Sequence, residues 1–166
     1  MSAFYLLKSE VRKMKLAEAL NLRADLQRRI QQLKNRLINN AKVQEGDQPA
    51  ESPEELLVEL EECCKELESI MVRINLTNAS ARNKDGKSIT ELIAAKDCLV
   101  LKLAVVRDFL ENASKKVDRY AHKEIRVLSS VNVREMQKQA DAMAKELRQI
   151  DTELQQINWN TDLAEG

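Results

Sequence analysis

Glycine, proline and aromatic residues are scarce in this chain of 166 residues. Three Gly and two Pro are too few for the many tight turns of a β-sandwich or a β-barrel. One Trp, two Tyr and two Phe are too few for a protein that binds nucleic acid by stacking bases on aromatic rings. Hydrophobic residues make up 43% of the chain, which suffices for a folded core and argues against intrinsic disorder. The composition therefore predicts a helical protein.

Long apolar runs are missing as well. Every stretch of 18 residues contains a charge, which argues against a transmembrane helix. The apolar patch Phe4–Leu7 has no basic residue before it, unlike the apolar core of a signal peptide. The three cysteines are an odd number, and Cys63 and Cys64 are neighbours on a predicted helix, where their side chains diverge. We therefore expect a cytoplasmic protein with reduced thiols.

The residues typical of catalytic and metal sites are not arranged as such a site requires. His122 is the single histidine, and its charged neighbours favour a solvated residue over a general base. Cys63, Cys64 and Cys98 lack the spacing of a zinc site. A di-iron site would need Glu three residues before the histidine, where the chain has Arg119. We therefore predict no catalytic, cofactor-binding or metal-binding residue, no cofactor and no enzymatic activity.

Apolar residues recur at steps of three and four along four segments, which is the spacing of amphipathic helices. Two start signals support the pattern, Ser52 before Pro53 and a capping box from Ser88 to Glu91. We predict an all-α protein whose long antiparallel helical hairpins form an elongated bundle or coiled coil. Residues 1–13 would be an N-terminal extension, and residues 14–166 a single helical domain with helices at about 15–43, 53–78, 89–120 and 133–157.

The third predicted helix is apolar on more than one face. Its seam contains one charged residue, Lys96, and it is widened by Ile93 and Val100 on one flank and by Ala95 and Phe109 on the other. A helix with so wide an apolar face is expected to contact more than one neighbour. The residues predicted to be central to the core of the protein are Leu99, Leu103, Val106, Leu147, Ile150 and Leu154.

A short segment at residues 124–131 alternates β-branched and polar residues and predicts an extended conformation. A single strand cannot satisfy its own backbone hydrogen bonds, and no other segment has a clear strand pattern. We therefore predict that a second copy of the chain pairs with this segment. The residues proposed to support oligomerisation are Ile125, Val127 and Val131.

Charge alternates in sign along the chain. Residues 1–43 have ten basic and three acidic side chains, whereas residues 44–70 have one and ten. Residues 71–131 have twelve basic and seven acidic side chains, and residues 132–166 have four and seven. Antiparallel neighbours would therefore attract each other through ion pairs. The basic first helix could also track phosphates, but the acidic second helix and a net charge of zero weigh against RNA.

Several separated segments resemble one family of small bacterial proteins, largely uncharacterised, in which some members bear the name septicolysin. That name implies a cytolysin, but the resemblance carries no catalytic or binding residues over to this chain. Met14 could be the native start, since residues 1–13 fall outside the resemblance. The segments that carry it are Met14–Leu26, Asn83–Leu92, Lys115–Tyr120, Glu124–Val127 and Asn158–Leu163.

These observations favour a non-enzymatic cytoplasmic scaffold or interaction protein whose first partner is itself. An unknown protein partner is also compatible with the helices. The balanced charge disfavours nucleic acid, and the acidic residues on the polar helix faces disfavour a membrane. Two alternatives stay open: a septicolysin-like membrane-active protein and an RNA-binding helical arm.

Overall fold

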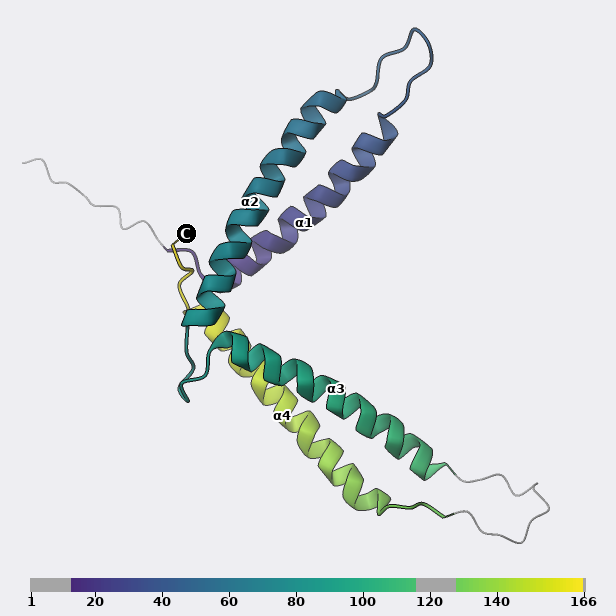
Figure 1. Ribbon diagram of the computed structural model, residues 1–166, viewed down its shortest axis with the longest axis vertical. Helices are drawn as coiled ribbons and strands as arrows, with labels where there is room; N and C mark the ends of the chain where they lie inside the picture. Colours follow the sequence, from purple (N-terminus) through teal and green to yellow (C-terminus); the bar gives the residue numbers. More distant parts are fainter. Residues whose placement is uncertain (1–12, 116–127, 166) are drawn as a thin grey trace, which may run out of the picture. The chain divides into compact units, whose positions relative to one another are not determined.

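The computed structural model describes residues 13–115 and 128–165, and in these ranges it contains four helices and no strand. The helices are α1 (Leu16–Asn39), α2 (Pro53–Ser80), α3 (Ile89–Ser114) and α4 (Val133–Asn160) (Figure 1). They pack against one another through the apolar faces that the sequence predicts. The predicted all-α fold class is therefore confirmed. None of the helices in these ranges is both long and apolar enough to cross a bilayer.

The contacts divide the chain into two compact units. In the described ranges, the first unit comprises residues 13–81 and 158–165, with α1, α2 and the end of α4. The second unit comprises residues 82–115 and 128–157, with α3 and the rest of α4. The single domain expected over residues 14–166 stays a prediction, and the expected extension lies outside the described residues except for Lys13.

In the first unit, α1 and α2 run antiparallel beside each other (Figure 1). They bury Leu33 of α1 against Leu56 and Cys63 of α2. The half-buried residues around this cluster are Ile30, Leu37 and Leu60. Steps of three, four and seven residues keep these side chains on one face of each helix, so burial follows from the spacing.

In the second unit, α3 and α4 form another antiparallel hairpin (Figure 1). Its core contains Leu103, Leu110 and Ala140. Of the six residues predicted for the core, Leu103 and Leu154 are buried and the other four are half-buried. The predicted inner faces of α3 and α4 are therefore confirmed.

Local hydrogen bonds set the helix ends. Ser52 accepts the backbone N–H of Glu55 at 3.3 Å, and Ser88 accepts that of Glu91 at 3.1 Å, as the two start signals predict. The prediction that the first helix reaches residue 43 is wrong, because α1 ends at Asn39. Asn40 ends it by donating its side-chain N–H to the Arg36 carbonyl at 2.9 Å and accepting the Glu51 N–H at 3.1 Å.

The other three helix ends differ from the predicted ends by two to six residues. Helix α2 and helix α4 extend two and three residues beyond the predicted ends, to Ser80 and Asn160. Helix α3 was predicted to reach residue 120 but ends at Ser114, and Lys115 is extended. The side chain of Asn112 bonds to the Asp108 carbonyl at 2.8 Å, one of the local hydrogen bonds that make asparagine a weak helix former. Residues 116–120 lie outside the described residues.

The segment predicted to be extended is described only in part. Ile125 and Val127 lie outside the described residues. Residues 128–131 form no strand: the side chain of Ser129 donates to the Val131 carbonyl at 3.1 Å and accepts from the Val131 N–H at 3.4 Å. These local hydrogen bonds occupy the groups that a strand partner would use at Val131.

The C-terminal segment, residues 161–165, is part of the first unit and bonds to the residues at the start of α1. Its Leu163 donates its backbone N–H to the Met14 carbonyl at 2.8 Å, and Leu16 donates to the Thr161 carbonyl at 2.9 Å. Leu163 is buried. The two ends of the described chain are therefore joined beside the base of α1, an arrangement that the sequence analysis did not predict.

Candidate interaction surfaces

Ion pairs join α1 to α2. Arg29 donates to Glu59 through Nη2 at 2.8 Å and through Nε at 3.0 Å. Arg36 binds Glu51 through Nε at 3.0 Å, and its Nη1 lies 3.5 Å from Glu59. These pairs confirm that the basic first helix and the acidic second segment are complementary, as the alternating charge predicts.

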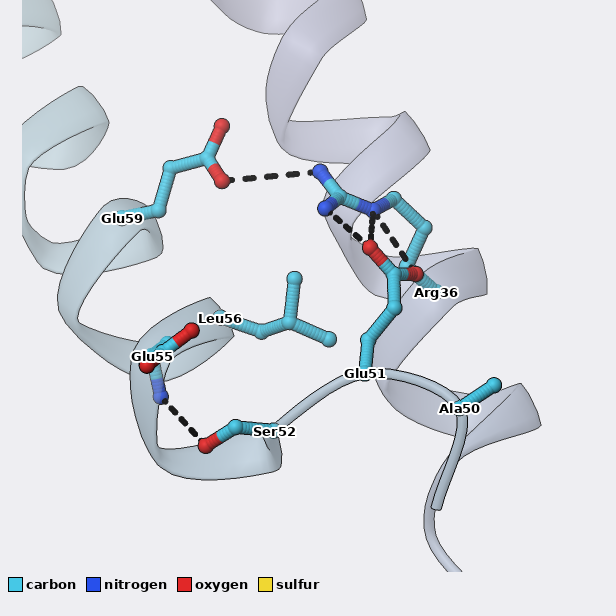
Figure 2. A pocket seen from close by; sticks show the side chains of 7 residues that line it. All are labelled: Arg36, Ala50, Glu51, Ser52, Glu55, Leu56 and Glu59. Atoms are coloured by element: carbon cyan, nitrogen blue, oxygen red, sulfur yellow. Dashed lines mark hydrogen bonds and ion pairs between the residues drawn. The ribbon is translucent and has the colours of Figure 1, made fainter.

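A polar pocket of about 330 Å³ lies beside these ion pairs. Figure 2 shows Arg36 reaching between Glu51 and Glu59 while Ser52 caps the first turn of α2. The hydrogen bond from Arg36 holds the pKa of the Glu51 carboxyl below its ordinary value. The residues that line the pocket are Arg36, Ala50, Glu51, Ser52, Glu55, Leu56 and Glu59.

This pocket is built for structure rather than for chemistry. Its one cation is neutralised by two carboxylates, and its one hydroxyl accepts a capping hydrogen bond. An ionised Glu51 held by Arg36 is a poor proton acceptor. Across the described residues, no group of His, Cys, Asp and Glu side chains is arranged to hold a metal ion.

Polar contacts also cross between α3 and α4. Lys96 places Nζ 2.6 Å from Oδ1 of Asp151, which explains the charged residue on the apolar seam of α3. Asn83, in the loop before α3, donates to Glu153 of α4 at 2.9 Å. The charge alternation predicted from the sequence therefore stabilises both hairpins.

The basic residues of α1 bear on the RNA-binding alternative. Three of the five lie in ion pairs with carboxylates: Arg28, Arg29 and Arg36. Just before the helix, Lys13 and Lys15 pair with acidic residues of the C-terminal segment. Arg23 and Lys34 have no ion pair among the described residues. A continuous set of free cations that could follow a phosphate backbone is therefore missing from the described part of this helix.

The side of α3 that faces away from α4 is strongly apolar, and we call it the α3 outer face. Leu101 and Val105, at its centre, are each 68% exposed. Ile93 and Val100 are exposed on one flank of this face, and Phe109 is exposed on the other. The wide apolar face predicts more than one neighbour for this helix, yet in the described part of the chain α4 covers only one of its faces. An exposed apolar surface of this kind is typical of a protein-protein contact.

Helix α2 has a smaller exposed apolar surface near its C-terminal end. Met71, Val72 and Leu76 are between 42% and 50% exposed, and we call them the 71–76 patch. Leu57 and Val58 are exposed at the opposite end of the same helix. The charged residues next to the 71–76 patch on the helix surface are Glu68 and Arg73.

The three cysteines occupy different environments. Cys63 is buried in the core between α1 and α2, whereas Cys64 on α2 and Cys98 on α3 are exposed, and all three are free thiols. Cys98, Leu101 and Val105 follow one another at steps of three and four residues, so Cys98 belongs to the α3 outer face. The reactivity of Cys64 therefore measures the accessibility of α2, and that of Cys98 measures the accessibility of the α3 outer face.

The residues predicted for oligomerisation are not brought together in the described part of the chain. Val131 is half-buried in the segment before α4, and the other two positions, 125 and 127, lie outside the described residues. Their role in self-association stays a prediction. The sequence feature that indicated the α3 outer face was the wide distribution of apolar residues around this helix.

Comparison with known proteins gives a family without an assigned activity. Residues 23–163 match a family of unknown function, DUF6847. The chain is also similar to a solved structure, described as a functionally unknown conserved protein from Corynebacterium diphtheriae, with 40% identity and a TM-score of 0.81. That similarity covers 92% of this chain and 99% of the other. Comparison with curated proteins finds no match. Neither of the two matches is described as a septicolysin.

Proposed function

The chain belongs to the family of unknown function DUF6847, and we propose that it is a non-enzymatic cytoplasmic interaction protein that self-associates through the α3 outer face. The observation that carries this proposal is the exposure of Leu101 and Val105 at the middle of a long helix. A second protein surface that covered them would remove apolar area from water, which is the main driving force of association.

The occupant that fits this face is a second copy of α3. Charged residues of both signs lie among and beside the exposed apolar ones: Asp97, Lys102, Arg107 and Asp108. Two copies of such a surface carry no net repulsion, so self-pairing is electrostatically permitted. By contrast, α2 contains many carboxylates and would repel its own copy. Charge thus favours α3 over α2 as the site of self-association.

The outer faces of α1 and α4 support the same choice. Both helices are strongly amphipathic, with buried residues on one side and mostly polar residues on the other. Helix α3 is weakly amphipathic because apolar residues surround it. In the second unit, α3 is therefore the helix with an apolar face left for a partner.

Two other functions compete with this proposal. An RNA-binding arm would need free cations along α1, and ion pairs occupy three of its five basic side chains. A septicolysin-like membrane-active protein would use an apolar face such as that of α3 against lipid. Charged residues interrupt this face, and they favour a protein partner over a bilayer. Liposome leakage and salt-dependent RNA binding are the assays that separate these functions from self-association.

The direct test is the molar mass of the full chain, measured by light scattering across a range of concentrations. We expect a dimer or larger species that dissociates on dilution. The double variant Leu101→Asp with Val105→Asp should weaken association about tenfold or more, because each carboxylate would lose hydration in the contact. The matched control is Leu57→Asp with Val58→Asp, the same pair of residue types on the outer side of α2. Circular dichroism checks the helix content of each variant.

Thiol alkylation gives a second readout in the unmodified chain. As concentration rises, Cys98 should react more slowly, while the exposed Cys64 keeps its rate and the buried Cys63 stays slow. A monomer at every concentration, or equal behaviour of Cys64 and Cys98, would overturn the proposal. Dye release from liposomes without self-association would favour the membrane-active alternative.

A further inference from the structure

We infer that two copies joined at the α3 outer face lie parallel and in register, and that charge selects this arrangement. This inference rests on the proposed self-association and goes beyond it, because it states how the second copy is oriented and which residues it contacts. Its support is the order of apolar and charged residues around α3.

One row of residues runs along the outer side of α3. Its members follow one another at alternating steps of four and three, the spacing at which two helices pack side by side. The first four members are apolar and exposed, and the last two are polar. In chain order the row contains Ala94, Cys98, Leu101, Val105, Asp108 and Asn112. Its apolar part therefore occupies about 18 Å of helix, or three turns.

Two opposite charges flank the apolar part of this row. Asp97 is the residue before Cys98, and Lys102 is the residue after Leu101. Because each residue turns the helix by about 100°, the two charges lie on opposite sides of the row. Both side chains are exposed, and neither has an ion pair among the described residues. Neither has an opposite charge three or four positions away on α3, so no pair within the helix competes for them.

A parallel second copy would use both charges. In a parallel pair, the residue before one row position faces the residue five places further along in the other copy. Asp97 of each copy then faces Lys102 of the other, and two-fold symmetry forms this ion pair twice. The fold already contains an ion pair beside an apolar seam, where Lys96 of α3 lies 2.6 Å from Asp151 of α4. The charges on both flanks therefore favour the parallel arrangement.

An antiparallel second copy has no such pairs. In one antiparallel register, Leu101 of one copy lies against Val105 of the other. Lys102 would then face its own counterpart, and Asp97 would face Glu111. A shift of one heptad toward the start of the helix would place both charges against alanines. Like charges in a contact oppose association, so an antiparallel copy is either repelled or gains nothing from these residues.

Asp108 limits the length of the parallel contact. It stands in the row one heptad after Leu101, so parallel copies bring this carboxylate toward its own counterpart. The two ion pairs lie within the apolar part of the row, whereas this single repulsion lies at its end. We therefore place the contact at residues 94–105. Asp108→Asn should strengthen self-association severalfold, and weaker association in this variant would contradict the parallel arrangement.

Single cysteines separate the two orientations. Cys64→Ser and Cys98→Ser remove the exposed thiols, and the native thiol that stays is buried. One cysteine is then introduced, as Ala94→Cys or as Val105→Cys, and the full chain is treated with a short bismaleimide. Both chains should form cross-linked dimers, because parallel copies place each position beside its own counterpart. The two positions lie about 16 Å apart along the helix, so no antiparallel register joins both. The matched control, Val58→Cys on α2, should form few dimers.

Charge reversal tests the ion pairs themselves. Asp97→Lys and Lys102→Asp should each weaken self-association about tenfold, because each brings like charges together twice. A mixture of the two variants should associate more tightly than either alone, since one supplies lysine at both positions and the other supplies aspartate. Asp141→Lys makes the same change at an exposed residue of α4 and should alter association little. Stronger association of the Asp97→Lys variant would fit the antiparallel pairing with Glu111 and overturn the inference.

Light scattering distinguishes failure of this inference from failure of the proposed function. A chain that is monomeric at every concentration overturns both. A chain that self-associates, but cross-links at only one of positions 94 and 105 or at neither, keeps the proposed function and overturns the parallel arrangement. Equal cross-linking of the Val58→Cys control would also overturn it, since random collisions would then explain the dimers.

Discussion

The Thr77 hydroxyl accepts a hydrogen bond from the backbone nitrogen of Ala164 at 2.9 Å and so fastens the C-terminal segment to α2. The same hydroxyl donates to the Arg73 carbonyl at 2.8 Å, and Arg73 in turn donates through Nε to the Ala164 carbonyl at 2.9 Å. Both polar groups of Ala164 therefore find partners one helical turn apart on α2. Because Thr77 is 2% exposed, water has little access to replace its hydrogen bonds.

We expect Thr77→Val to lower the free energy of unfolding by about 1–3 kcal/mol, because the variant keeps the size of the side chain but leaves the Ala164 N–H without its acceptor. Thr77→Ser is the matched control, since it keeps the hydroxyl, and it should cost less. Urea denaturation followed by circular dichroism measures both. If the serine variant lost as much stability as the valine variant, the hydrogen bond would not be the cause.

The interior of each hairpin offers a second stability test. Leu103→Ala should cost about 2–5 kcal/mol, because Leu103 is 3% exposed and its removal leaves a cavity beside Leu110 and Ala140. Val105→Ala, two residues further on, should change stability by less than about 0.5 kcal/mol in dilute protein, because Val105 is 68% exposed. Urea denaturation at low concentration compares them. Similar losses of stability in the two variants would show that the inner face of α3 is assigned incorrectly.

The helix starts and inner faces could be predicted because their causes are local. Ser52 and Ser88 stand at fixed positions before their helices, and the spacing around Leu103 defines a face without knowledge of its partner. The attachment of the C-terminal segment could not be predicted, because its hydrogen bonds to α2 and to Met14 use backbone groups of the segment, as between the N–H of Leu163 and the carbonyl of Met14. Backbone groups occur in every residue, so they leave no signal in the order of side chains.

The candidate surfaces were predictable only in part. The alternating charge predicted that the first two helices attract each other through ion pairs, of which the pair between Arg29 and Glu59 is one, but it did not predict which residues pair. The wide apolar face of α3 was also visible, but periodicity defines a face and not what covers it. The prediction that helix one continues past Asn40 was wrong because the periodicity carried on where side-chain hydrogen bonds end the helix.

The ion pair between Arg29 and Glu59 gives a charge-reversal test. Arg29→Glu should lower the thermal midpoint slightly, because it puts two carboxylates together, and Glu59→Arg should do the same beside Arg29 and Arg36. The double variant should recover part of the loss by restoring the pair in the opposite order. High salt should reduce all three differences. Additive losses in the double variant at low salt would contradict a direct pairing.

Acid sensitivity should arise in part from the start of α3. Oε2 of Glu91 accepts the Ser88 N–H at 2.6 Å and contacts the Ser88 hydroxyl at 2.7 Å, and these hydrogen bonds hold the pKa of Glu91 below its ordinary value of 4.5. Below pH 4.5 the unfolded chain therefore binds a proton before the folded chain does. The stabilisation by Glu91 is complete above pH 4.5 and is lost as the pH falls through its lower value in the folded chain.

The variant Glu91→Gln tests this pH dependence, because glutamine completes the capping box without a titrating group. The native chain should be the more stable of the two near neutral pH, and the difference between their urea midpoints should shrink as the pH falls below 4.5. Both chains should keep some acid sensitivity, since Arg36 and Lys15 also lower the pKa values of Glu51 and Asp162. The difference between the two chains isolates Glu91 from these carboxylates. A difference that stayed constant through the acid range would mean that the proton equilibrium of Glu91 does not contribute to folding.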